Sequence, residues 1–111
     1  MQKIIINGEI FNISKEKYLK NGTPAITIYC KDGGSIEPYL DLTVNFHGAS
    51  TVLGNDEIAV KTWSENEPFV NILLQSGFFQ DTGKRVKISS FVEAHIWKMT
   101  KEITGDGLWM N

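Results

Sequence analysis

The residues of this chain that could perform nucleophilic or metal chemistry are few and far apart. Cys30 is the single cysteine, and His47 and His95 are the two histidines. No local motif indicates that the fold brings a cysteine and a histidine together as an activated nucleophile. Cys30 alternates with Ile26 and Ile28, which favours a small buried hydrophobe. The spacings CxxC, HxH and HExxH do not occur, so the sequence predicts no metal and no cofactor.

Carboxylates gather in one part of the sequence. Asp56, Glu57, Glu65 and Glu67 lie close together along the chain, and two carboxylates can act as general acid and general base. A solvated acidic edge beside the start of a helix explains the same residues without catalysis. We therefore predict that the protein is not an enzyme, and we assign no catalytic residue.

Residues 64–77 carry the pattern of an amphipathic helix. Ser64 followed by Glu67 matches a capping box, in which the serine oxygen accepts a backbone N–H of the first turn. Pro68 lies in that turn, where its missing N–H costs little, and Gly77 is a suitable C-terminal stop. Loss of the cap on substitution of Ser64 by alanine is expected to cost about 1 kcal/mol.

The remaining sequence reads as hairpins. Asn7-Gly8, between two β-branched runs, predicts a two-residue type I′ turn. Together these patterns predict an α+β domain: a mostly antiparallel sheet of about six to seven strands built from hairpins, with one amphipathic helix packed on it. A single domain is expected over residues 1–104, followed by an aromatic tail at 105–111. The predicted strands are residues 3–6, 9–13, 25–31, 38–46, 58–63, 78–88 and 89–99.

Composition excludes several classes of protein. The chain has 111 residues and a formal net charge of −2, which argues against a strongly basic nucleic-acid-binding domain. One cysteine allows no intramolecular disulfide and is typical of a reducing compartment. The sequence has no signal-peptide pattern and no apolar run of the ~20 residues that a membrane span requires. We expect a cytoplasmic protein that does not enter a membrane.

A small group of basic residues is the candidate nucleic-acid-binding surface. It consists of Lys84, Arg85, Lys87 and Lys98, with Trp97 next to Lys98. Aromatic residues interleaved with cations on a sheet can bind single-stranded nucleic acid. Lysines on edge strands also protect a sheet against aggregation, so the pattern has a structural explanation as well.

Tryptophan and its apolar neighbours are the candidate partner-binding residues. Leu108, Trp109 and Met110 follow two glycines at the end of the chain, and Trp63 and Trp97 occur earlier. Tryptophan and methionine are enriched at protein interfaces. The tail therefore either docks on its own domain or binds another chain. A homodimer through an exposed sheet edge is also compatible with the sequence.

Several motifs resemble those of a family of small uncharacterised bacterial proteins that are common on conjugative transposons and other mobile elements. The family combines an LTVN strand, a SENE helix start, a TG-x turn and an FVE strand. Trp63 stands where tyrosine is more frequent, Phe78 where isoleucine is usual, and the last dozen residues lie outside the pattern. The matching residues are Asn7-Gly8, Leu42 to Asn45, Lys61, Trp63 to Glu67, Gly77, Thr82 to Lys84 and Phe91 to Glu93.

The resemblance implies an accessory gene of a mobile element and brings no catalytic residue, cofactor or substrate. We therefore expect a non-enzymatic, protein-binding accessory factor of a mobile element or phage. Its most concrete form is an inhibitor of a host defence nuclease, of the anti-CRISPR or anti-restriction type. The alternative is a small nucleic-acid-binding regulator that uses the basic and aromatic sheet surface.

Overall fold

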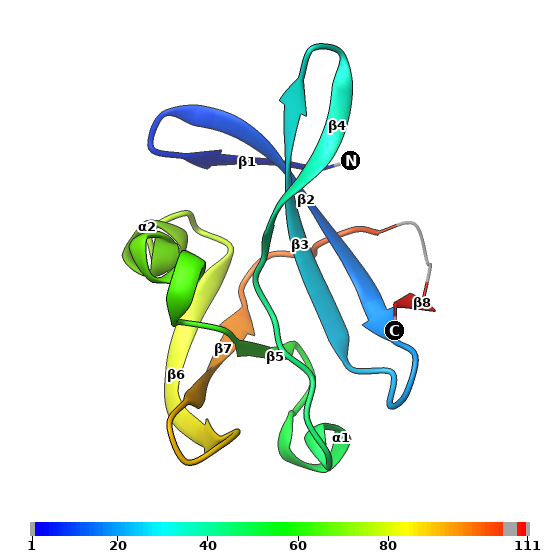
Figure 1. Cartoon of the computed structure of the whole chain (residues 1–111), viewed down its shortest axis with the longest axis vertical. Coiled ribbons are helices and arrows are strands. Elements are labelled where there is room, and N and C mark those ends of the chain that lie inside the picture. The colour runs from blue at the N-terminus through cyan, green and yellow to red at the C-terminus, as the bar shows by residue number, and fades with distance from the viewer. Residues whose placement is uncertain (1, 106–108, 111) are drawn as a thin grey trace.

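The computed structural model describes residues 2–105 and, as backbone only, residues 109–110. Figure 1 shows how the helices and strands of these residues are arranged. Within them, no helix is long and apolar enough to cross a membrane. The elements are β1 (Gln2–Ile6), β2 (Glu9–Tyr18), β3 (Pro24–Asp32), β4 (Ser35–Asp41), α1 (Ala49–Val52), β5 (Glu57–Val60), the 3-10 helix η1 (Ser64–Phe69), α2 (Val70–Leu74), β6 (Phe79–Lys87), β7 (Glu93–Met99) and β8 (Trp109–Met110).

The strands form two sheets, so the prediction of one sheet with six to seven strands is wrong. In sheet A the order is β1-β2-β3-β4, and β8 runs parallel to the end of β2. In sheet B the order is β5-β7-β6. The coarser prediction, an α+β chain of mostly antiparallel strands, is confirmed.

The chain passes from sheet A to sheet B directly after β4. The Leu42 N–H donates to the Ile26 carbonyl of sheet A at 3.0 Å, whereas the Val44 N–H donates to the Ala59 carbonyl of sheet B at 3.0 Å. The alternating run at residues 38–46, which the sequence presents as one strand, therefore serves both sheets.

The hairpin of β1 and β2 has the predicted turn. Asn7 and Gly8 have φ values of 54° and 80°, the positive values that a type I′ turn requires at both central positions. Because side chains alternate along a strand, Ile4 and Ile6 are buried while Ile5 is 63% exposed. The register that this turn fixes decides which isoleucines enter the core.

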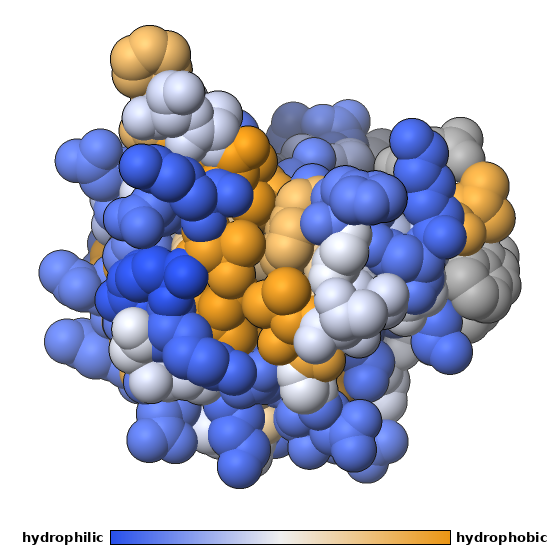
Figure 2. Space-filling model, turned by 90° about the horizontal axis from the view of Figure 1, so that it is seen from below, coloured by the Kyte–Doolittle hydropathy of each residue, from blue (hydrophilic) through white to orange (hydrophobic). Residues whose placement is uncertain are grey.

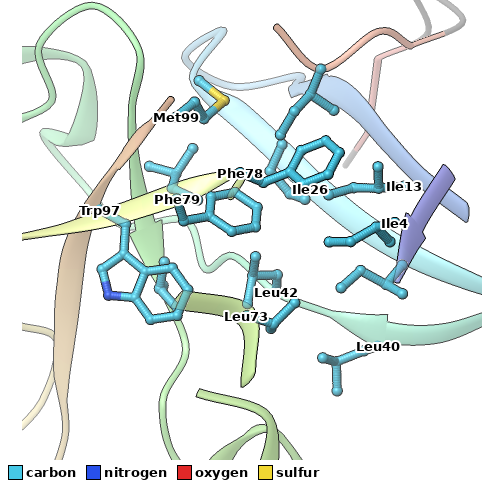
Figure 3. Close-up of a cluster of buried hydrophobic side chains, with 14 of the residues drawn as sticks. Ile4, Ile13, Ile26, Leu40, Leu42, Leu73, Phe78, Phe79, Trp97 and Met99 are labelled. Carbon is cyan, nitrogen blue, oxygen red and sulfur yellow. The ribbon is translucent and has the colours of Figure 1, made fainter. Parts of the chain in front are cut away.

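The main hydrophobic core lies between the inner faces of the two sheets (Figure 3). Trp97 of β7 is fully buried, and the centroid of its ring lies 5.6 Å from that of Phe79. Leu73 of α2 is also fully buried, so this short helix covers part of the core. Further core residues labelled in the figure are Ile4, Ile13, Ile26, Leu40, Leu42, Phe78 and Met99.

The predicted capping box at Ser64 is wrong, and the single helix is divided in two. Ser64 has a φ of 60° and begins η1, whose N-cap is Trp63 without a side-chain cap hydrogen bond. An N-cap residue normally has an extended backbone, which a φ of 60° excludes. Glu65 pairs with Lys61 at 2.6 Å. The hydrogen bond from this ammonium group is the largest of several causes that lower the pKa of Glu65 to about 2.

Substitution of Ser64 by glycine should raise the free energy of unfolding by about 0.5–1 kcal/mol. A left-handed backbone costs a residue with a Cβ atom roughly 1–2 kcal/mol, and glycine avoids this cost. Part of the gain is lost because glycine gives the unfolded chain more conformational freedom. Thermal unfolding followed by circular dichroism would measure the change. Ser90 is an exposed serine without a positive φ, so Ser90→Gly is the matched control. A lower melting temperature for Ser64→Gly would contradict the prediction.

The chain after β7 continues along the edge of β2. Ile103 is buried in the main core, and the Lys15 N–H donates to the Thr104 carbonyl at 3.1 Å. At Gly105 a Cβ atom would overlap the backbone carbonyl of Lys15, so only glycine fits this approach. The backbone of β8 then pairs with residues 17–18 of β2.

Candidate protein-interaction surface

Three segments that are far apart in the sequence meet at the bottom of the molecule in Figure 1, and we call this region the loop end. It comprises the β2–β3 turn at residues 19–23, the segment around α1 at 44–55, and the end of β6 with the β6–β7 turn at 85–92. The first two segments are joined by a hydrogen bond from Asn21 Nδ2 to Asn45 Oδ1 of 2.8 Å. The third joins the second through an apolar cluster.

This apolar cluster covers the outer face of sheet B, on the side opposite the main core. Ala59, Ala94 and Ile96 form its buried floor. Cross-strand pairing puts Ala59 beside Ile96 on this face. In the view from below, Figure 2 shows hydrophobic side chains across the middle of the surface with polar residues on both sides. The half-buried members of the outer apolar cluster are Val44, Phe46, Leu53, Val86 and Ile88.

Phe91 projects from the β6–β7 turn and is 95% exposed. The Ile88 N–H donates to the Val92 carbonyl at 3.0 Å and closes the turn beneath it. The Phe91 N–H donates to the Ser89 Oγ atom at 3.2 Å. The aromatic ring is therefore presented on an ordered turn, which reduces the conformational entropy lost when a partner binds it.

The other two segments of the loop end also present apolar side chains. Leu19 in the β2–β3 turn is 57% exposed, and Val52 in α1 is 43% exposed. Each of the three segments thus contributes one large exposed hydrophobic residue. Exposed apolar side chains on segments that flank an apolar cluster are compatible with an interaction surface.

The loop end differs in charge from the rest of the protein. Its three segments contain Lys20, Arg85 and Lys87 but none of the thirteen Asp and Glu of the chain. They carry a formal charge of +3, and the remainder, with eight Lys and Arg against thirteen Asp and Glu, carries −5. Arg85 is paired with Asp81 at 2.9 Å, and the register of sheet B puts Lys87 opposite Glu93. Among the described residues, Lys20 is therefore the cation of these segments that has no carboxylate paired with it or opposite it.

The predicted nucleic-acid-binding cations have acidic neighbours. Lys84 pairs with Glu57 at 2.8 Å, and Arg85 forms two hydrogen bonds of 2.9 Å with the Asp81 carboxylate. The hydrogen bonds from these cations hold the pKa values of Glu57 and Asp81 below their usual range. Both carboxylates are ionised at neutral pH, so they compensate the charge of the two cations.

The other two predicted cations also face carboxylates. The register of sheet B puts Lys98 opposite Glu57 and Lys87 opposite Glu93. Phosphate contacts depend on cations that can replace the counterions of the nucleic acid, and these cations already have anionic neighbours within the protein. This arrangement disfavours the nucleic-acid-binding alternative.

The structure corrects one of the predicted partner-binding residues. Trp97 is fully buried in the main core, so its assignment to a binding surface, for protein or for nucleic acid, is wrong. Trp63 is half-buried at the start of η1. The backbone of Trp109 and Met110 forms β8 on the protein's own sheet A, and Leu108 lies outside the described residues. Partner binding by the tail stays a prediction.

The residues that could act as nucleophiles or metal ligands lie in different parts of the fold. Cys30 is half-buried on β3 and packs against the main core. His47 is exposed in the loop end, and His95 lies on β7, where burial and the nearby Arg85 lower its pKa. Among the described residues, no three His, Cys, Asp or Glu side chains are grouped as metal ligands would be.

Comparisons with protein-family models, with curated proteins and with solved structures find no match to this chain. The resemblance to small proteins of mobile elements therefore stays a prediction. The geometry and charge of the loop end are the basis on which a function can be assigned.

Proposed function

We propose that this protein is a non-enzymatic binding factor that docks a partner protein on its loop end. The observation that carries the proposal is Phe91, which is 95% exposed on a hydrogen-bonded turn beside the outer apolar cluster. Aromatic side chains that fill a partner's pocket commonly supply most of the binding energy of an interface. The ordered turn favours this role because the ring is already positioned.

The energy available from this side chain is enough to control a complex. Transfer of an exposed phenylalanine into an apolar site contributes about 1.5–3 kcal/mol, which corresponds to roughly 10–150-fold in the dissociation constant. The outer apolar cluster and Val52 would add area around it. The main core remains intact when this surface is covered, because the cluster lies on the other face of sheet B.

The partner that we propose is a host defence nuclease of the bacterial cytoplasm, such as a CRISPR effector or a restriction enzyme. The support is the resemblance to accessory proteins of mobile elements, a setting that is rich in small proteins that block host defence. A binding surface without a role in chemistry of its own fits such an inhibitor, since blocking a nuclease requires only a stable contact.

The expected effect of Phe91→Ala is a complex about 10–100-fold weaker, because the exposed ring no longer fills the partner's pocket. The partner is first isolated with the tagged full chain, and its affinity for purified variants is then measured by biolayer interferometry. Ile10→Ala is the matched control, since Ile10 is 64% exposed near the start of β2. The β1–β2 hairpin lies away from the loop end in Figure 1. Equal affinity of Phe91→Ala and the unmodified protein would overturn the proposed docking site. An isolated nuclease that keeps full activity at saturating protein would overturn its inhibition.

A further inference from the structure

A polar groove lies beside the outer apolar cluster. It has a volume of about 610 Å³ and opens between the β2–β3 turn and the segment that leads into α1. This volume is in the range of sites that hold a small ligand, so a single side chain has room to enter. Phe46 belongs to both the groove and the outer apolar cluster, so the two surfaces are continuous. The groove is lined by Lys20, Asn21, Asn45, Phe46, His47 and Ser50.

The hydrogen bonds around the groove occupy the side-chain oxygens of its two asparagines and leave N–H and O–H donors available. Asn45 Oδ1 accepts from Asn21 Nδ2 at 2.8 Å and from the Phe46 N–H at 3.0 Å. Asn21 Oδ1 accepts from the Thr23 hydroxyl at 2.8 Å. An asparagine carries two N–H donors besides its oxygen, so the Asn45 amide group can still donate. The Ser50 hydroxyl and the Lys20 ammonium group are further donors in the lining.

The charge of the groove is positive. Lys20 is exposed and forms no ion pair with another described residue. None of the residues that line the groove is acidic, and the whole loop end lacks Asp and Glu. A cation with several neutral donors and no anion around it favours an anionic group as the occupant.

We propose that the groove receives an aspartate or glutamate side chain of the partner protein, while Phe91 makes an apolar contact with the same partner on the other side of the outer apolar cluster. This inference rests on the proposed function and specifies the partner's surface: an apolar patch with a carboxylate at its rim. A protein carboxylate fits better than a nucleic acid, because Lys20 is one cation beside an apolar surface, whereas a phosphate backbone needs several. Arg85 of β6 is already paired with Asp81.

Two short fluorescein-labelled peptides test this inference on the intact protein by fluorescence anisotropy. The first alternates glutamate with leucine, and the second has glutamine in place of every glutamate. The first should bind about tenfold more tightly, and the difference should shrink as salt rises because exposed charges are screened. The variants are Lys20→Gln, Phe91→Ala and, as a matched control with an exposed lysine on β1, Lys3→Gln.

Lys20→Gln should remove the preference for the acidic peptide, whereas Lys3→Gln should keep it. Phe91→Ala should weaken both peptides by the same factor. If the unmodified protein binds both peptides equally and Phe91→Ala weakens both, the carboxylate site is refuted while the proposed function stands. The inference is also refuted if the acidic peptide does not bind. It is refuted as well if an oligothymidylate displaces the acidic peptide and binds the Lys20→Gln variant more weakly than the unmodified protein. Peptide binding that Phe91→Ala leaves unchanged would count against the proposed function instead.

Discussion

Substitution of Trp97 by alanine should lower the free energy of unfolding by about 3–5 kcal/mol, which is the usual cost of removing a buried aromatic side chain. Trp97 is fully buried and packs against Phe79 in the main core. The surrounding strands belong to two sheets and cannot close the resulting cavity without separating from their hydrogen-bonded neighbours. Denaturation with urea, followed by circular dichroism, would give the change.

Two further variants separate packing from other roles of this residue. The Trp97 Nε1 atom is buried without a hydrogen-bond partner among the described residues. Trp97→Phe therefore removes an unsatisfied donor together with part of the ring, and it should cost less than Trp97→Ala. Trp63→Ala, at a half-buried tryptophan, should also cost less. If the Trp97→Ala protein kept normal stability but no longer bound its partner, Trp97 would be a partner-binding residue and not a core residue.

The turns and the buried faces of the strands in this fold can be predicted from the sequence. Asn7-Gly8 specifies a turn, and the turn sets the register that buries Ile4 and Ile6. Alternation along a strand shows which side chains share a face, but it does not show which strands become neighbours. The passage of the chain from sheet A to sheet B depends on long-range backbone hydrogen bonds that the Leu42 and Val44 N–H groups donate. That is why hairpins were predictable and the two-sheet arrangement was not.

The candidate site could be predicted in part for the same reason. Both faces of β7 carry apolar residues in the sequence, as expected for a strand covered on two sides, and the main core and the outer apolar cluster do cover it. That pattern already argues against an exposed Trp97. The lack of acidic residues at 19–23, 44–55 and 85–92 is visible in the sequence, but only the fold brings the three segments together. The sequence singles out Phe91 only as part of the FVE motif, because its exposure depends on the turn around it.

The SENE motif illustrates how a tertiary contact overrides a local pattern. Asn66, its third residue in the numbering Ser64 to Glu67, is 1% exposed. Its Nδ2 atom donates to the Asp41 carbonyl and to the Lys61 carbonyl, both at 2.9 Å. These bonds tie η1 to the end of β4 and to the segment after β5. A regular capped helix starting at Ser64 is therefore replaced by a 3-10 turn that positions this amide.

Substitution of Asn66 by alanine should cost about 2–5 kcal/mol of unfolding free energy. It leaves the part-buried hydrogen bonds to the Asp41 and Lys61 carbonyls unmade, and each group that is left unsatisfied away from water costs about 1–3 kcal/mol. Equilibrium denaturation would measure the loss. Asn71→Ala is the matched control, because Asn71 is exposed in α2 and alanine has the higher helix propensity.

Asn66→Asp distinguishes the hydrogen bonds from the shape of the side chain. Aspartate has nearly the same size, but in its ionised form it can only accept hydrogen bonds. Its oxygen would face the Asp41 and Lys61 carbonyls in place of the donor, so this variant should be at least as unstable as Asn66→Ala. If both variants instead kept the stability of the unmodified protein, packing alone would hold η1 in place. Asn66 would then have no structural role that these variants can detect, and the surface around η1 would become a second candidate for partner binding.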